Sequence, residues 1–171
     1  MATHQVSPLA PAGLPELPPI AGVRFAAGCT GMRYRDRDDV MLAALAPGST
    51  VAAVTTRNTM CSAPVLWCRE RAKGGRVRAI VVNAGNANTF TGRDGMRAVE
   101  ATAKATAHAL ECDPREVFVS STGVIGVKLP ADKLTATLPA LAASLRADAW
   151  PRAARAIMTT DTFPKAARRT A

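Results

Sequence analysis

The hydrophobic pattern of the chain contains two runs in which successive residues are apolar. These runs cover residues 77–82 and 117–121, and each passes directly into a stretch rich in Asn, Ser, Thr or Gly. A strand that is wet on one face alternates apolar and polar positions, whereas a strand buried on both faces does not. We therefore predict two interior strands that end in small-residue loops.

Two shorter apolar or β-branched runs precede them, at residues 23–29 and 50–55. A charged turn at residues 34–39 and the Pro47-Gly48 pair separate these runs, and Pro and Gly are the strongest local markers of turns. The pattern predicts two early strands.

Helical spacing and capping residues predict the helices. Ser62 stands at an N-cap position before a helix over residues 63–73, in which Val65, Leu66 and Cys68 are expected to face the core while the position of Trp67 is left open. Asp94 is expected to cap a second helix over residues 95–111. Its apolar stripe consists of Met96, Val99, Ala103, Ala107 and Leu110.

Prolines mark the later helices. Pro130 is expected at the first position of a helix that runs through Leu138, Pro139 is expected to kink or restart it towards Leu145, and Pro151 opens a further helical turn. A strand thus runs through a loop into a helix twice, which predicts an α/β fold with a sheet layered by helices. Residues 1–20, interrupted by five prolines, read as an extended or disordered lead-in to a single domain over residues 21–171.

Charge and composition bear on the partners. The net charge of +9 makes nucleic acid the first partner to consider, but aromatic residues form only 4% of the chain and do not interleave with the basic ones. Basic residues cluster only at Arg33, Arg35 and Arg37 and again at residues 165–169. A solvated face, or attraction of a small acidic substrate, accounts better for the charge, so we expect no nucleic-acid partner.

Compartment and cofactors follow from what the sequence contains. Four cysteines show no C-x-x-C and no zinc spacing, so we expect reduced thiols in a cytoplasmic protein and no metal site. No apolar stretch approaches the ~18 residues of a membrane span, so we expect no membrane association. Of the two histidines, His4 lies in the lead-in and His108 on a predicted helix, which argues against a Ser-His-Asp arrangement.

Three stretches are candidates for a site, and each leaves an alternative open. The turn around Thr122 and Gly123 would offer backbone N–H donors to an oxyanion, or it is a plain strand-to-helix turn. The loop with Asn83, Asn86 and Asn88 would bind a ligand, or its amides stabilise the loop itself. The cluster of Thr159, Thr160 and Asp161, with Lys165 nearby, would hold the carboxylate and ammonium of an amino acid, or it is a cap and turn cluster.

Taken together, the motifs resemble the α chain of the ornithine acetyltransferase (glutamate N-acetyltransferase) family. The resemblance covers roughly residues 20–165, and its last two motifs are specific. The motifs, in order, are Arg57-Asn58, Ala63-Pro64-Val65, Asn-Ala-Gly-Asn-Ala-Asn at 83–88, Ser-Thr-Gly-Val-Ile-Gly at 121–126, and Ile-Met-Thr-Thr-Asp-Thr-Phe-Pro-Lys at 157–165.

The resemblance implies an enzyme of arginine biosynthesis that moves an acetyl group from N-acetylornithine to glutamate, with some members also using acetyl-CoA. Family members cleave themselves into α and β chains, and the N-terminal threonine of the β chain is the nucleophile. We therefore expect a β-chain partner in an α2β2 assembly and no cofactor. The family pattern assigns the oxyanion hole to Thr122 and Gly123 and a substrate contact to Thr159, with Thr160 and Asp161 beside it.

The chain departs from the family pattern at its end. It stops at Ala171, before the family's glycine-rich segment with a substrate-binding lysine and before the Ala-Thr cleavage junction, and Lys165 is not that lysine. The domain is thus expected to be incomplete at its C-terminal end and to hold half a site at most. Two other hypotheses stay open: a non-catalytic assembly subunit or degenerate fragment of the same fold, and a basic nucleic-acid-binding domain.

Overall fold

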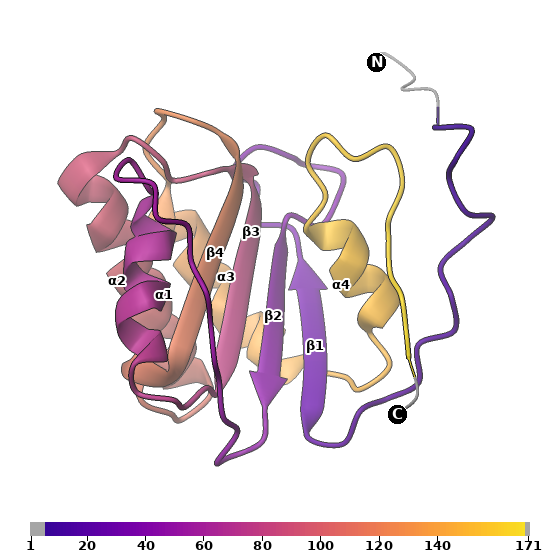
Figure 1. The fold of residues 1–171 in the computed structure, drawn as a ribbon, viewed down its shortest axis with the longest axis horizontal. Helices are drawn as coiled ribbons and strands as arrows, with labels where there is room; N and C mark the ends of the chain where they lie inside the picture. Colours follow the sequence, from indigo (N-terminus) through magenta and orange to yellow (C-terminus); the bar gives the residue numbers. More distant parts are fainter. Residues whose placement is uncertain (1–5, 170–171) are drawn as a thin grey trace.

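Four strands form one open sheet in the computed structural model, which describes residues 6–169 (Figure 1). Their order across the sheet is β1-β2-β3-β4, with antiparallel pairing of β1 with β2 and of β2 with β3, and parallel pairing of β3 with β4. The strands are Val23–Gly28 (β1), Val40–Leu45 (β2), Ala79–Asn86 (β3) and Val117–Val124 (β4). Together with the helices described below, this confirms the predicted α/β class.

The parallel pair β3 and β4 is joined by the long helix α2, Gly92–Ala109. Two neighbouring strands that run in the same direction need such a crossover, because a tight turn would leave the second strand antiparallel to the first. The connection places the C-terminal ends of β3 and β4 side by side at one end of the sheet, and the chain from β1 to β2 turns at the same end. The ends of β3 and β4 and the β1–β2 connection therefore lie at the end of the sheet where Asn86, Thr122 and Gly123 also lie.

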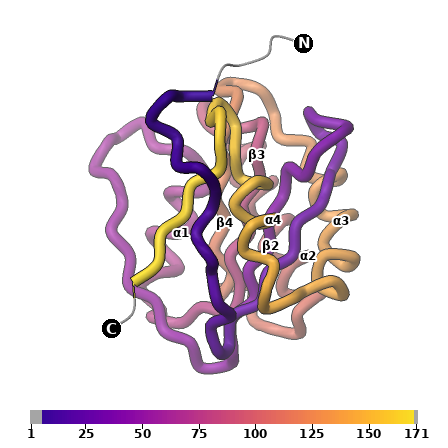
Figure 2. The backbone as a smooth tube through the Cα atoms, turned by 90° about the vertical axis from the view of Figure 1, so that its right-hand side faces the viewer, coloured from indigo at the N-terminus to yellow at the C-terminus, as the bar shows by residue number. Residues whose placement is uncertain are grey.

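Helices cover the two faces of the sheet unequally. The larger core lies on one face of the sheet, against α2 and α3 (Ala131–Ala143), whose backbone course Figure 2 shows. There Leu42, Val81, Val119 and Leu134 are fully or almost fully buried. On the opposite face the short helix α4, Trp150–Ala156, packs through its alanines on Phe25, Met41 and Ala43. The residues before β1 and those after α4 run near each other outside α4, and no helix in the described part of the chain has the length and apolar character of a membrane span.

One predicted interior strand is in fact the edge strand. β3 is interior, but β4 lies at the edge of the sheet that residues 6–169 form, with helix α1 (Ala63–Ala72) along it. Trp67 Nε1 donates to the Val117 carbonyl at 2.8 Å and Cys68 Sγ to the Val119 carbonyl at 3.2 Å. The unbroken apolar run of β4 arises because α1 shields the edge and occupies its carbonyls, which a hydrophobic pattern does not distinguish from a neighbouring strand.

Of the two predicted early strands, one is confirmed and the other is wrong. β1 lies where residues 23–29 predicted it, but residues 50–55 form only an isolated bridge, between Thr50 and Arg76. The second strand is β2, at residues 40–45, in which five of six residues are buried. Its Met, Leu and Ala residues favour a helix as much as a strand, and pairing with β1 and β3 decides the conformation.

The first helix was predicted with its orientation wrong. Ser62 occupies the N-cap position, although its side chain makes no capping hydrogen bond. Trp67, whose position was left open, is 9% exposed, whereas Leu66 is 44% exposed and does not face the core. The Trp67 indole donates a hydrogen bond to the buried Val117 carbonyl, whereas Leu66 has no polar group that could do so. The contact with β4 therefore decides which side of α1 faces inward.

The later helices differ from prediction at their starts. α2 begins at Gly92 with Thr91 at the N-cap position, so Asp94 lies in the first turn and does not cap it. The predicted stripe on α2 is confirmed, because its members are buried or pack against the core.

Pro130 stands at the N-cap of α3 and not at its first position, and α3 continues through Pro139 without restarting. Pro139 is exposed, so the hydrogen bond it cannot make is lost on the solvent side. α4 starts beside Pro151 as predicted.

Candidate functional site

Of the three asparagines predicted to lie in a loop, Asn83 and Asn86 belong to β3 and only Asn88 follows it, because the pairing with β4 extends the strand. All three are buried and bind the chain itself. Asn83 donates to the Asn86 carbonyl at 2.9 Å and accepts from Ser121 Oγ at 2.6 Å, which joins β3 to β4. Asn86 Oδ1 accepts from the Asn88 amide at 2.8 Å, and Asn88 Nδ2 donates to the Gly95 carbonyl at 3.0 Å, at the start of α2. These bonds favour the second interpretation of the loop, in which the amides hold the strand ends in place. Contact of Asn83, Asn86 or Asn88 with a substrate stays a prediction.

Two glycines face each other where β3 and β4 end. Gly85 pairs with Gly123, and both have positive φ, 102° and 133°. A Cβ on Gly123 would lie 2.3 Å from the Gly85 carbonyl carbon, so no other residue fits without moving the strands. Gly123 is exposed and Thr122 half-buried. Because main-chain groups alternate along a strand, those of Gly123 point to the same side as the Val119 carbonyl, away from β3.

The cluster after α4 has no regular secondary structure. Asp161 accepts from the Lys165 ammonium and, at 3.4 Å, from the amide of Thr159. The hydrogen bond from Lys165 is the main cause that holds the pKa of the Asp161 carboxyl below its usual value. Thr160 is exposed and Thr159 half-buried. Asp161 thus has a cation within its own segment, as the turn interpretation requires, while the threonines face solvent in part.

The predicted site segments lie at the same end of the sheet but near its two opposite edges. β4 is one edge strand, and residues 158–165 follow α4, which packs on β1 at the other edge (Figure 1). Three strand spacings of ~4.8 Å separate the two edges by about 14 Å. The structure therefore does not bring Thr122 and Gly123 into direct contact with the residues after α4.

The loop between β1 and β2, residues 29–39, lies between these segments, and its sequence pattern predicts only a charged turn at residues 34–39. The Arg37 guanidinium lies over the Tyr34 ring, 4.4 Å from its centroid, and donates to the Met158 carbonyl. At the other side of the loop, Arg33 and Tyr34 lie directly over Gly85. The only signal in the sequence was the arginine cluster, which indicates charge but not position.

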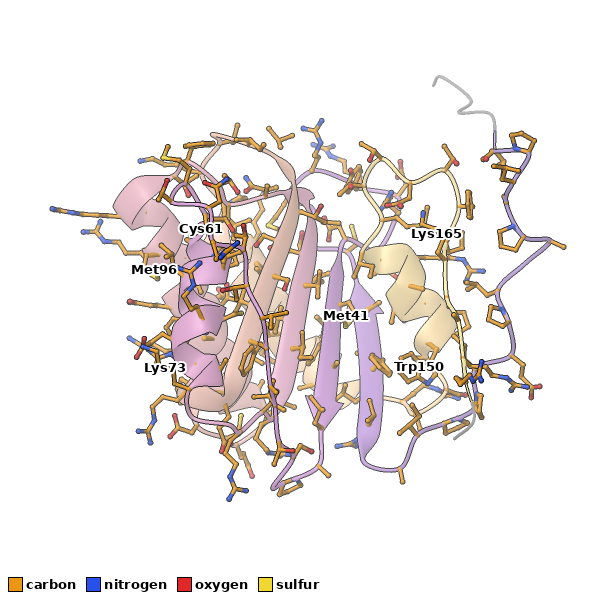
Figure 3. The ribbon with its side chains drawn as sticks, viewed as in Figure 1. Met41, Cys61, Lys73, Met96, Trp150 and Lys165 are labelled. Carbon is orange, nitrogen blue, oxygen red and sulfur yellow. The ribbon has the colours of Figure 1, made fainter. Side chains whose placement is uncertain are left out.

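A cleft of about 550 Å³ lies away from the strand ends, between α4, the residues before β1 and the residues after α4. Its lining includes the apolar side chains of Phe25, Met41 and Trp150 and the basic residues Lys165 and Arg168. Figure 3 labels Met41, Trp150 and Lys165 among them. Trp150 Nε1 is buried without a hydrogen-bond partner among residues 6–169. Neither Thr122 nor Gly123 lines this cleft, and their role as oxyanion donors stays a prediction.

The α/β fold, with its parallel pair of strand ends, is similar to the folds of two solved proteins. The solved ornithine acetyltransferase of Mycobacterium tuberculosis, complexed with ornithine, superposes with a TM-score of 0.79 at 40% identity, over 84% of this chain and 78% of that chain. The arginine biosynthesis bifunctional protein of Bacillus halodurans superposes with a TM-score of 0.75 at 31% identity, over 83% of this chain and 74% of that chain.

The chain belongs to the ArgJ family, whose model matches residues 24–171. It is 58% identical over 164 residues to the arginine biosynthesis bifunctional protein ArgJ of Gluconobacter oxydans and 51% identical over 165 residues to that of Bradyrhizobium diazoefficiens. These matches cover 96% of this chain but only 38% and 40% of those relatives, so the chain spans about two fifths of their length. The family that the motifs indicated is confirmed.

Proposed function

We propose that this chain is the α-chain portion of a cytoplasmic amino-acid N-acetyltransferase of arginine biosynthesis. The enzyme transfers an acetyl group from N-acetylornithine to glutamate, and acetyl-CoA is a further donor in some members of the family. The observation that carries the proposal is the Gly85–Gly123 pair at the ends of β3 and β4, which only glycine can form and which directly follows Thr122.

The chemistry explains why such a strand end matters. Acetyl transfer through a threonine ester passes through a tetrahedral oxyanion when the ester forms and again when it breaks, and preorganised N–H donors are the largest single aid to that step. The amide of Gly123 and the amide or hydroxyl of Thr122 are the proposed donors. The asparagine bonds to Ser121 and to the start of α2 hold this end of the sheet rigid, so the donors need no reorganisation.

The nucleophile is proposed to come from a partner. The only histidine among residues 6–169 is His108, which is exposed on α2 and activates no hydroxyl or thiol. We propose a β chain that begins with threonine, assembled as α2β2, with Thr159, Thr160 and Asp161 on the substrate side. The sequence resemblance supports these assignments, and the shared end of the sheet is compatible with them.

A non-catalytic assembly subunit, or a degenerate fragment of the same fold, is the second candidate. The edge position of β4 and the Trp150 indole nitrogen, which has no hydrogen-bond partner among residues 6–169, suit places that another segment covers. This second candidate predicts that the chain forms a stable complex with a partner and that the complex transfers no acetyl group.

The test is formation of N-acetylglutamate from N-acetylornithine and glutamate, with and without a partner polypeptide that supplies the rest of the family's length and begins with threonine. We expect no turnover by the purified chain and turnover by the complex. Turnover by the chain alone would contradict the division of the site between two chains. A well-formed complex without turnover would favour the assembly subunit.

A further inference from the structure

Arg33 extends over the glycine pair at the end of β3. Its Cβ and Cδ lie 3.1 and 3.2 Å from the position that a Cβ on Gly85 would occupy, so the aliphatic part of Arg33 fills the space that Gly85 leaves open. Gly85 pairs directly with Gly123. A guanidinium is thereby carried to the strand end at which the oxyanion donors are proposed.

The charge environment of Arg33 resembles that of Arg35 in the same loop, which also forms no ion pair within residues 6–169. Arg33 forms no ion pair with a carboxylate of residues 6–169, although its loop contains three aspartates. Asp38 forms an ion pair with Arg152 at 2.7 Å, and Asp39 is fully buried and accepts hydrogen bonds from Thr30. Asp36 is exposed and forms no ion pair in the described residues. The cation beside Gly85 is therefore available to a ligand carboxylate.

The loop that carries Arg33 is anchored at its base. Asp39 accepts from the Thr30 amide at 2.6 Å and from Thr30 Oγ1 at 2.8 Å, and the Met32 amide donates to the same hydroxyl at 3.1 Å. The Asp39 carbonyl accepts from the Ala84 amide at 2.8 Å, next to Gly85. A loop held to β3 in this way presents its arginine at a fixed place, which lowers the entropy lost when a ligand binds.

We propose that Arg33 binds the side-chain carboxylate of the glutamate acceptor and so determines which amino acid receives the acetyl group. A guanidinium matches a carboxylate with two parallel N–H···O bonds. The side chain of ornithine ends instead in an ammonium, which the same cation repels, so Arg33 favours the acceptor over the product that must leave. This inference rests on the proposed transfer reaction.

The test compares Arg33→Met with Arg35→Met in the complete two-chain assembly. Both variants remove one positive charge from the same exposed loop, but Arg35 has no contact with Gly85. For Arg33→Met we expect the KM for glutamate to rise about 10- to 100-fold, the range of a lost charge-assisted hydrogen bond. The KM for N-acetylornithine should not rise, because the guanidinium repels the side-chain ammonium of that donor and does not bind it. The kcat should stay within about threefold of wild type, as should all constants of Arg35→Met.

Glutamate binding without an acetyl donor, measured by calorimetry, separates this inference from the proposed function. If wild type transfers no acetyl but binds glutamate, and only Arg33→Met loses that binding, the proposed function fails and the role of Arg33 stands. Equal glutamate affinity in wild type and Arg33→Met overturns the inference, as does absence of glutamate binding to wild type. A fall in kcat with unchanged KM for glutamate also overturns it, because it would mean that Arg33 acts on the oxyanion.

Discussion

Replacement of Gly123 by alanine should damage both the fold and the site, and Gly126 offers a matched control. Gly123 lies within the last residues of β4, where a turn was predicted, and Gly126 follows the strand. Both have positive φ, 133° and 79°. They differ in surroundings. A Cβ on Gly123 would lie 2.3, 2.6 and 2.7 Å from main-chain atoms of Gly85 and Asn86, whereas a Cβ on Gly126 would have nothing within 4 Å.

The expected cost follows from this difference. Placing a Cβ on a residue with positive φ costs about 1–2 kcal/mol, and Gly126→Ala should lose no more than that. At Gly123 the contact must open from 2.3 Å to an ordinary separation of about 3.5 Å, so the ends of β3 and β4 must move apart by roughly 1 Å. Two or three ladder bonds at about 0.5–1.5 kcal/mol each are weakened, which brings the expected loss to about 3–5 kcal/mol.

Urea unfolding followed by circular dichroism measures the stability of both variants, and acetyl transfer by the two-chain assembly measures the site. Gly123→Ala should shift the unfolding midpoint several times further than Gly126→Ala and should abolish most transfer. Equal shifts for the two variants would refute the argument, since they would mean that the close approach of β3 and β4 contributes nothing.

Three further predictions concern single side chains. Trp67→Phe should lower the free energy of unfolding by about 1–3 kcal/mol, because a buried β4 carbonyl loses its donor, whereas Leu66→Ala on the exposed side should cost less than about 0.5 kcal/mol; equal losses would contradict the orientation of α1. Thr122→Val should lower kcat of the assembly by about 10²–10³-fold with little change in KM if the hydroxyl is an oxyanion donor, and wild-type turnover would leave only the main-chain role. Burial raises the pKa of the Cys68 thiol above its ordinary value of 9.0, so the thiol ionises first in the unfolded chain. The contribution of the thiol to folding stability is therefore complete below about pH 9 and declines as the pH rises. The difference in unfolding free energy between wild type and Cys68→Ala should narrow in alkali, and a constant difference would contradict the burial argument.

Elements with strong periodic patterns were predictable, and those decided by long-range contacts were not. The α2 stripe and the interior position of β3 follow from local spacing, and both are confirmed, although β3 extends to Asn86, past its predicted end at Val82. The edge position of β4 and the inward orientation of Trp67 share one cause, which is that α1 docks along β4 and donates to its carbonyls. A pattern of hydrophobic residues records that a position is covered but not by which element, so both errors come from one contact that local spacing does not encode.

The site shows the same limit in chemical terms. Asn83 and Ser121 were recognisable as polar residues at strand ends, but the sequence does not show that their hydrogen bonds join the two strands to each other. Arg33 was recognisable only as one of three clustered arginines. Its place over Gly85 requires the turn from β1 to β2 to lie at the same end of the sheet as the parallel strand ends, which depends on the antiparallel pairing of β2 with β3. Since β2 was the strand that the sequence pattern missed, the position of Arg33 beside the glycine pair could not be inferred without the structure.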